Sequence, residues 1–130
     1  MTSEDLATVH IFEGLDDDTL ADVAQRCIAI GAHAGAKLVH QGESGFDFYM
    51  IHGGEAGVVI DEEEVATLGP GDVFGEMALL GRRHRNADVT AKTQMSLITM
   101  MVWDFRQVIE DHPEIEHRLR ALAEQRLSED

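Results

Sequence analysis

Residues 74–87 hold the side chains best suited to ligand chemistry in this 130-residue sequence. Gly75 and Glu76 precede a short helix-favouring stretch, and the basic loop that follows ends in Arg85. Unpaired backbone N–H groups at the start of a helical turn can bind an anion. A guanidinium can hold a phosphate through two parallel hydrogen bonds. A carboxylate repels phosphate but accepts hydrogen bonds from hydroxyls, so the three groups together fit a sugar phosphate.

The charge of the chain is strongly negative, with 10 Lys and Arg against 25 Asp and Glu and a net charge of −15. Proteins that bind nucleic acid or anionic membranes generally present basic surfaces, so the composition argues against both. The charge is also segregated. Residues 41–76 contain nine acids and no Lys or Arg, whereas residues 82–92 contain four of the ten cations and only one acid. The few positive residues therefore gather where a phosphate would lie.

The sequence offers little support for other chemistry. The histidines are scattered without a His-x-His pair, so no metal site of the cupin type is predicted. No nucleophile stands beside an evident base, and no carboxylates are paired for hydrolysis, so no enzyme is predicted. The single cysteine, Cys27, excludes a disulfide framework and favours a reducing cytoplasm. The acidic N-terminus is not a signal peptide, and no apolar run could span a membrane.

The central part of the chain reads as strands separated by turns. Eleven of the twelve glycines lie between Gly31 and Gly81, among short β-branched runs. This pattern predicts an antiparallel sandwich or barrel of the jelly-roll kind. The acidic run Asp61–Glu64 is predicted to be a solvated hairpin tip. The expected strands are Ile28–His33, Lys37–His40, Phe46–His52, Glu55–Ile60, Glu64–Leu68, Asp88–Ala91 and Met95–Met101.

The two flanks of the chain read as helices. A first apolar-periodic piece is followed by a helix for which Asp16 is the predicted N-cap. Cys27 is expected to be a buried residue on the apolar face of this helix. The predicted apolar positions of the N-terminal flank are Leu6, Val9 and Phe12, then Leu20, Val23, Ala24 and Cys27.

The C-terminal flank is predicted to form two further helices. Asp104 is expected to cap the first of them, with Gln107 three residues on. Trp103 is expected to be a packing residue at the strand–helix junction. Pro113 is expected to be the first residue of the last helix. The predicted apolar positions are Phe105, Val108 and Ile109, then Ile115, Leu119 and Leu122.

Several motifs occur in one order along the chain. Residues 74–79 read Phe-Gly-Glu-Met-Ala-Leu, and Arg85 follows after a short loop. Upstream lie the glycine-containing motifs Gln41–Glu43, Gly54-Glu55 and Gly69–Asp72, and the run Phe48–Ile51. With these motifs the sequence closely resembles the cyclic nucleotide-binding domain of protein kinase A regulatory subunits, catabolite-activator proteins and cyclic-nucleotide-gated channels. The resemblance covers roughly residues 6–122, so residues 1–130 are expected to form one such domain.

The resemblance implies a role for each matching residue. Glu76 would accept a hydrogen bond from the ribose 2′-hydroxyl near the Gly75 backbone, and Arg85 would pair with the cyclic phosphate. Backbone N–H groups of Ala78 and Asn86 would complete the phosphate cradle. Two valines on the sheet would pack against the purine, and the helix from Pro113 would fold over the base. The expected site consists of Val58, Val65, Phe74, Gly75, Glu76, Met77, Ala78, Arg85, Asn86 and Ala87.

Two positions depart from the family pattern. The residue after the arginine is usually Ala, Ser or Thr, and a hydroxyl there is associated with cGMP preference; here Asn86 offers an amide that could bond a guanine edge or crowd the site. The lid helix has no aromatic residue, so Leu119, Leu122 or the stem of Arg118 is expected to cover the base.

The expected fold is therefore mainly β with flanking helices: an antiparallel β-roll or jelly roll with N-terminal helices, a short phosphate-cassette helix and C-terminal lid helices. The expected function is an allosteric cAMP sensor, with cGMP as the alternative ligand and no cofactor. Binding would order the cassette, close the C-terminal helices and present a new surface to an effector protein in trans or to a domain outside this chain. A ligand-free interaction module and a metal-dependent enzyme remain the rival hypotheses.

Overall fold

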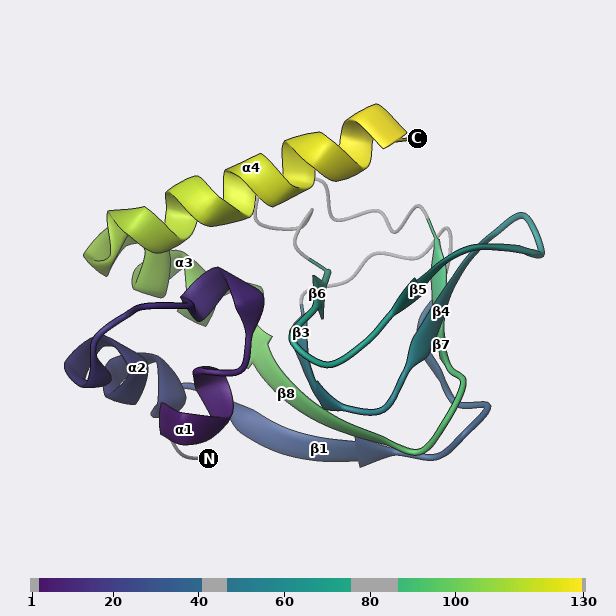
Figure 1. The fold of residues 1–130 in the computed structure, drawn as a ribbon, viewed down its shortest axis with the longest axis horizontal. Coiled ribbons are helices and arrows are strands. Elements are labelled where there is room, and N and C mark those ends of the chain that lie inside the picture. Colours follow the sequence, from purple (N-terminus) through teal and green to yellow (C-terminus); the bar gives the residue numbers. More distant parts are fainter. Residues whose placement is uncertain (1–2, 41–46, 76–86, 130) are drawn as a thin grey trace.

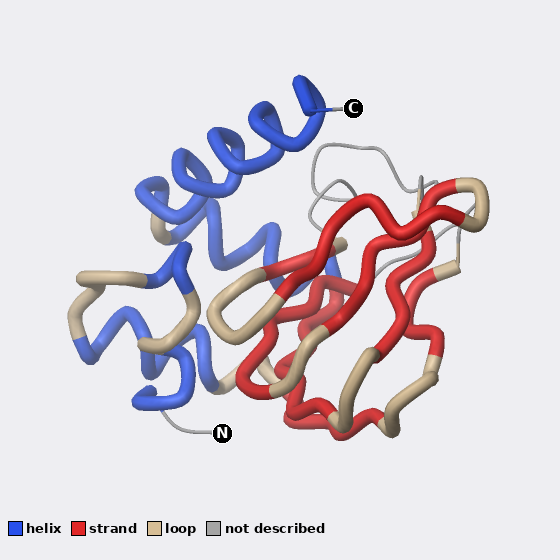
Figure 2. The backbone as a smooth tube through the Cα atoms, turned by 45° about the vertical axis from the view of Figure 1, so that its right-hand side comes forward, coloured by secondary structure: helices blue, strands red, loops and turns tan. Residues whose placement is uncertain are grey.

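The computed structural model describes residues 3–40, 47–75 and 87–129. Figure 2 shows the helices gathered on one side of the strands, in the order helices, strands, helices that the sequence predicts. The elements are α1 (Ser3–Leu6), η1 (His10–Phe12), α2 (Asp17–Ala24), β1 (Ile28–Ala32), β2 (Lys37–Val39), β3 (Asp47–Gly53), β4 (Ala56–Ile60), β5 (Glu63–Leu68), β6 (Val73–Phe74), β7 (Asp88–Ala91), β8 (Met95–Met101), α3 (Val102–Asp111) and α4 (Pro113–Glu129).

The described strands form two antiparallel sheets of four strands each, in the orders β1-β8-β3-β6 and β2-β7-β4-β5 (Figure 1). All seven expected strands are present, and β7 and β8 have the expected bounds. The sequence did not predict β6, which has only two residues and is too short to show a period. The acidic tip between β4 and β5 is exposed as predicted, with Asp61 and Glu62 at positive φ, but Glu64 also pairs with Lys92 at 3.1 Å.

Two apolar cores share the first sheet. One lies between that sheet and the helices, and the other lies between the two sheets. Strand β8 contributes to both, because alternate residues of a strand point to opposite faces. Ile98 and Met100 belong to the helix-side core, while Met95 and Leu97 belong to the core between the sheets.

The N-terminal helices follow the sequence prediction closely. The Thr19 N–H donates to Asp16 Oδ1 at 2.8 Å, so Asp16 caps α2. This backbone hydrogen bond lowers the pKa of the Asp16 carboxyl. Cys27 is partly buried against the helix-side core, where its thiol donates to the Val23 carbonyl oxygen at 3.3 Å. The predicted apolar residues that are fully buried here are Leu6, Val9, Phe12, Leu20 and Val23.

The start of α3 differs from the prediction. The helix begins at Val102 directly after β8, and its N-cap is Met101, which makes no side-chain cap hydrogen bond. Asp104 is therefore a first-turn residue and not the cap, and Gln107 instead donates to Asp111 Oδ1 at 3.2 Å. Trp103 lies at the strand–helix junction as expected, but 54% of this residue is exposed, so it packs only in part. Val102 and Phe105 form the buried face of this turn.

Candidate functional site

Strand β6 fixes the entrance to the motif at residues 74–79. Phe74 pairs with Tyr49 of β3, and their rings stack with centroids 4.8 Å apart and an interplanar angle of 11°. Phe74 is only 3% exposed, in the core between the sheets. Gly75 then has φ +88°, a conformation that L side chains rarely adopt. The glycine thus redirects the chain immediately after a firmly packed aromatic residue.

The turn before β6 is held by its own hydrogen bonds. The Gly69 N–H donates to Asp72 Oδ2 at 2.8 Å. The Gly71 N–H donates to the Ile51 carbonyl oxygen at 2.8 Å, and the Ile51 N–H donates to the Asp72 carbonyl oxygen at 2.9 Å. The His10 N–H of η1 reaches the Gly71 carbonyl oxygen at 2.9 Å, and His10 Nδ1 lies 3.4 Å from Asp72 Oδ1. This turn therefore connects the N-terminal helices to the strand that leads into the motif.

The second sheet carries the two valines that are expected to pack against a base. Val58 of β4 lies opposite Val89 of β7 and Ala66 of β5, so the three residues share one face of the sheet. Val89 is buried in the core between the sheets, and Val58 is half-buried on that same face. Val65 is 54% exposed beside a register shift, so its side chain is accessible. Ala87, immediately before β7, is buried.

The remaining predicted residues lie outside the described part of the chain. They are Glu76, Met77, Ala78, Arg85 and Asn86, together with the basic loop Arg82–His84. The structure thus describes the frame on both sides of this segment and the candidate wall.

Both lysines of the chain lie in or beside the second sheet and face carboxylates: Lys37 Nζ is 3.4 Å from Asp88 Oδ2, and Lys92 Nζ is 3.1 Å from Glu64 Oε2.

Helix α4 packs against the N-terminal helices in a way that the sequence did not predict. It begins at Pro113, as expected, and buries Ile115 and Leu119 in the helix-side core. Arg118 donates from one guanidinium nitrogen to the carbonyl oxygens of Ile11 at 3.0 Å and Glu13 at 2.6 Å. In this arrangement Leu119 and Arg118 are both engaged between helices. That Leu119, Leu122 or the stem of Arg118 covers a bound base stays a prediction.

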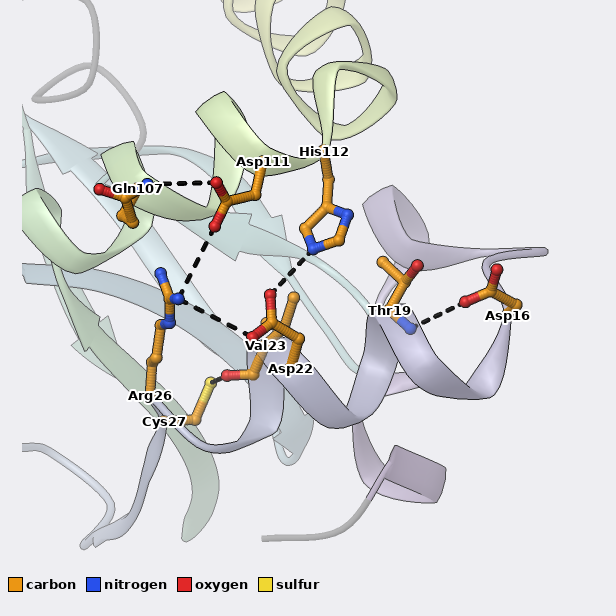
Figure 3. A network of polar contacts seen from close by, with 9 residues as sticks. All are labelled: Asp16, Thr19, Asp22, Val23, Arg26, Cys27, Gln107, Asp111 and His112. Carbon is orange, nitrogen blue, oxygen red and sulfur yellow. Dashed lines mark hydrogen bonds and ion pairs between the residues drawn. The ribbon is translucent and has the colours of Figure 1, made fainter.

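A polar network also joins α2 to the junction between α3 and α4 (Figure 3). His112 Nε2 lies 2.9 Å from Asp22 Oδ2. Arg26 Nη2 lies 3.8 Å from a carboxylate oxygen of Asp22 and 3.8 Å from one of Asp111. The beginning of α4 is thus tied to α2 about one helical turn before Ile115 and two before Arg118.

Neither a metal cluster nor a membrane span is found in the described residues. No three His, Cys, Asp or Glu side chains there are placed to hold a metal ion. Among the helices that the structure describes, none is long and apolar enough to cross a membrane.

Comparison with known proteins gives a consistent picture. The family model of the cyclic nucleotide-binding domain matches residues 31–112. The chain is 40% identical over 95 residues to the cAMP-dependent protein kinase regulatory subunit of Schizosaccharomyces pombe, covering 72% of this chain and 23% of that protein. It is 32% identical over 121 residues to a cyclic nucleotide-gated potassium channel of Rhizobium etli, covering 93% of this chain and 34% of the channel. The chain therefore spans about a third or less of these relatives' length.

A solved structure supports the same conclusion. The regulatory domain of Toxoplasma gondii PKA, crystallised with cAMP, superposes with a TM-score of 0.82 at 27% identity, covering 100% of this chain and 49% of that one. This agreement confirms the predicted roll of two antiparallel sheets with flanking helices, an architecture that serves non-catalytic ligand-binding domains in the regulatory subunits. With the family model matched across most of the strands and α3, the chain belongs to the cyclic nucleotide-binding domain family.

Proposed function

We propose that this chain is a sensor that binds a cyclic mononucleotide, with cAMP as the first candidate and cGMP as the second. One observation carries the proposal: the family match spans the motif at residues 74–79, and the described frame delivers the chain into that motif through buried Phe74 and positive-φ Gly75. The cAMP-bound Toxoplasma domain supports cAMP as the first ligand to test.

The proposed contacts follow the chemistry of the ligand. Arg85 pairs with the cyclic phosphate, and Glu76 accepts from the ribose hydroxyl. Backbone N–H groups of Ala78 and Asn86 complete the phosphate site. The half-buried face of Val58 and the accessible Val65 pack against the purine.

The proposed output is a movement of the helices, read by an effector protein or by another domain in the cytoplasm. Helix α4 is bonded to η1 through Arg118, and His112, the residue before α4, pairs with Asp22 of α2. A movement of α4 would therefore strain or break contacts with the N-terminal helices. Those helices also contact the turn before β6 through His10, so the ligand site and the helices share a physical connection.

Isothermal titration with cAMP and with cGMP tests the proposal. Arg85→Ala should weaken binding by about 2–5 kcal/mol, because it removes the charge partner of a bound phosphate. Arg120→Ala is the matched control: this arginine pairs with Glu116 on the outer part of α4 and should leave affinity unchanged. Saturating ligand at 100 times its Kd should also raise stability by about 2.7 kcal/mol in thermal unfolding. Absence of any shift with either nucleotide would instead favour a ligand-free interaction module.

A further inference from the structure

Strand β1 is an unusual edge strand. In the described part of the chain it pairs only with β8, and it lies along the lower margin of the molecule in Figure 1. Its sequence, Ile28–Ala32, has no charged residue, and its first four residues are exposed. Ile28 is 64% exposed and Ile30 is 37% exposed. An edge of this kind is a template for pairing with another strand.

The other described edges carry the protection that β1 lacks. Strand β2 has three residues and begins with Lys37. Strand β5 begins with Glu63 and Glu64 and contains a register shift against β4. Strand β6 has only two residues. Charges, irregularities and short length are the usual means by which edges avoid pairing, so the bare edge of β1 stands apart.

The two faces of β1 differ in chemistry. Ile30 lies opposite Leu97, and Ile28 lies opposite Thr99, so both isoleucines point to the side of the core between the sheets. Ala29 and Gly31 lie on the other face, which belongs to the helix side of the sheet. A strand added to β1 would therefore place every other side chain on the apolar face of Ile28 and Ile30. Its remaining side chains would lie on the helix-side face, with Ala29 and Gly31.

The second face is hollowed. A groove of about 330 Å³ lies there, and no Lys or Arg is among the residues that line it. Its floor includes the small residues Ala29, Gly31 and Ser96, and His52 and Asp5 lie at its polar part, 3.5 Å apart between Nε2 and Oδ1. A Cβ at Gly31 would meet nothing closer than the Met95 carbonyl oxygen at 3.8 Å, so packing within the chain does not require glycine there. The small floor leaves room for a side chain from outside.

We propose that β1 and this groove bind an extended peptide segment of a partner protein, added as a further strand, in which apolar and basic residues alternate. The apolar residues cover Ile28 and Ile30, and the basic residues reach across the small floor toward Asp5. The charge of the protein supports this choice, because a net charge of −15 attracts a cationic segment and opposes close approach of a second copy of the same chain. This surface is separate from the proposed nucleotide contacts and does not depend on nucleotide binding.

The test uses the full chain and a short synthetic peptide of alternating valine and lysine, measured by isothermal titration and by amide hydrogen exchange. A peptide in which glutamate replaces lysine is the charge control. The lysine peptide should bind and protect amides of β1, while the glutamate peptide should not. Gly31→Val fills the groove without changing charge and should weaken binding at least about tenfold, as loss of a central contact does.

Three further variants decide between the possible outcomes. Ile30→Lys should weaken binding similarly, and Asp5→Asn should weaken it less. Ala121→Lys adds the same charge at an exposed site on α4 and should leave binding unchanged. Equal binding of the two peptides, full binding by Gly31→Val, or a gain of amide protection that leaves the β1 amides unchanged would overturn the proposal. Sedimentation showing a dimer that Ile30→Lys dissociates would likewise overturn it, since a second copy would then occupy the edge.

Discussion

Gly71 should be the least replaceable glycine in the turn that leads to the candidate site. Its φ is +94°, and a Cβ built there would lie within 3.0 Å of three atoms of the His10 ring. Gly71→Ala should therefore lower the free energy of unfolding in two ways. It strains the backbone at residue 71, and it displaces the His10 side chain that docks the N-terminal segment. The two can be separated because only the second involves His10.

The magnitudes follow from the surroundings. A non-glycine residue in left-handed backbone costs about 1–2 kcal/mol. The His10 ring is largely exposed and can move, but moving it loosens its contact with Asp72 at 3.4 Å. An exposed pair of this kind contributes about 0–1 kcal/mol. Gly71→Ala should thus lower the free energy of unfolding by about 1–3 kcal/mol in total.

Urea denaturation of a double-mutant cycle measures both parts. In a His10→Ala background, Gly71→Ala should cost about 0.5–1 kcal/mol less than in the wild type, since the ring is no longer displaced. Gly69→Ala is the matched control in the same turn: its Cβ would meet nothing within 4 Å, so stability should change by less than about 0.5 kcal/mol. If Gly71→Ala lowers the free energy of unfolding as much in the His10→Ala background as in the wild type, the steric reasoning is refuted. A Gly71→Ala variant as stable as Gly69→Ala would refute the backbone reasoning too.

Three other predictions concern a buried side chain, a hydrogen-bonded helix cap and a buried thiol. Leu119→Ala should lower the free energy of unfolding by about 2–5 kcal/mol in chemical denaturation, because this side chain is 1% exposed in the helix-side core. The hydrogen bond from Thr19 lowers the pKa of the Asp16 carboxyl in the folded protein. The ionised carboxylate should therefore stabilise the folded protein at pH values above the unfolded-state pKa of Asp16. This stabilisation should be lost as the pH falls through the folded-state pKa. Denaturation across acidic pH should therefore show wild type and Asp16→Ala converging. Burial raises the pKa of Cys27 to about 12, so iodoacetamide at pH 8 should label the native protein far more slowly than the unfolded chain, and equal rates would contradict this.

The strands and helices could be predicted from the sequence because each has a clear local signal. Glycine turns bounded the strands, and the Asp16 cap and Pro113 marked where two helices begin. The signal failed at the junction of β8 and α3. There the strand continues directly into the helix, and buried Val102 sets its start without a polar cap. A strong capping pattern at Asp104 was therefore misleading, since tertiary packing outweighs a local hydrogen-bond option.

The motif at residues 74–79 could be recognised in the sequence, but the contacts that support its entrance could not. No local pattern indicated that Tyr49 would stack on Phe74, or that His10 would reach Gly71, because each pair joins segments distant in the sequence. The apolar stripe of α4 is evident in the sequence, but the stripe does not say which surface it covers. Only the fold shows that Leu119 and Arg118 face the N-terminal helices.

The position of β8 has a consequence for how the domain melts. Its residues alternate between the core on the helix side and the core between the sheets. Because both cores need β8 in place, neither core can unfold while the other stays folded. The helices and the roll should therefore unfold as one cooperative unit. A ligand that touches only the roll would then slow the opening of helices it never contacts, through the shared free energy of a single folding equilibrium.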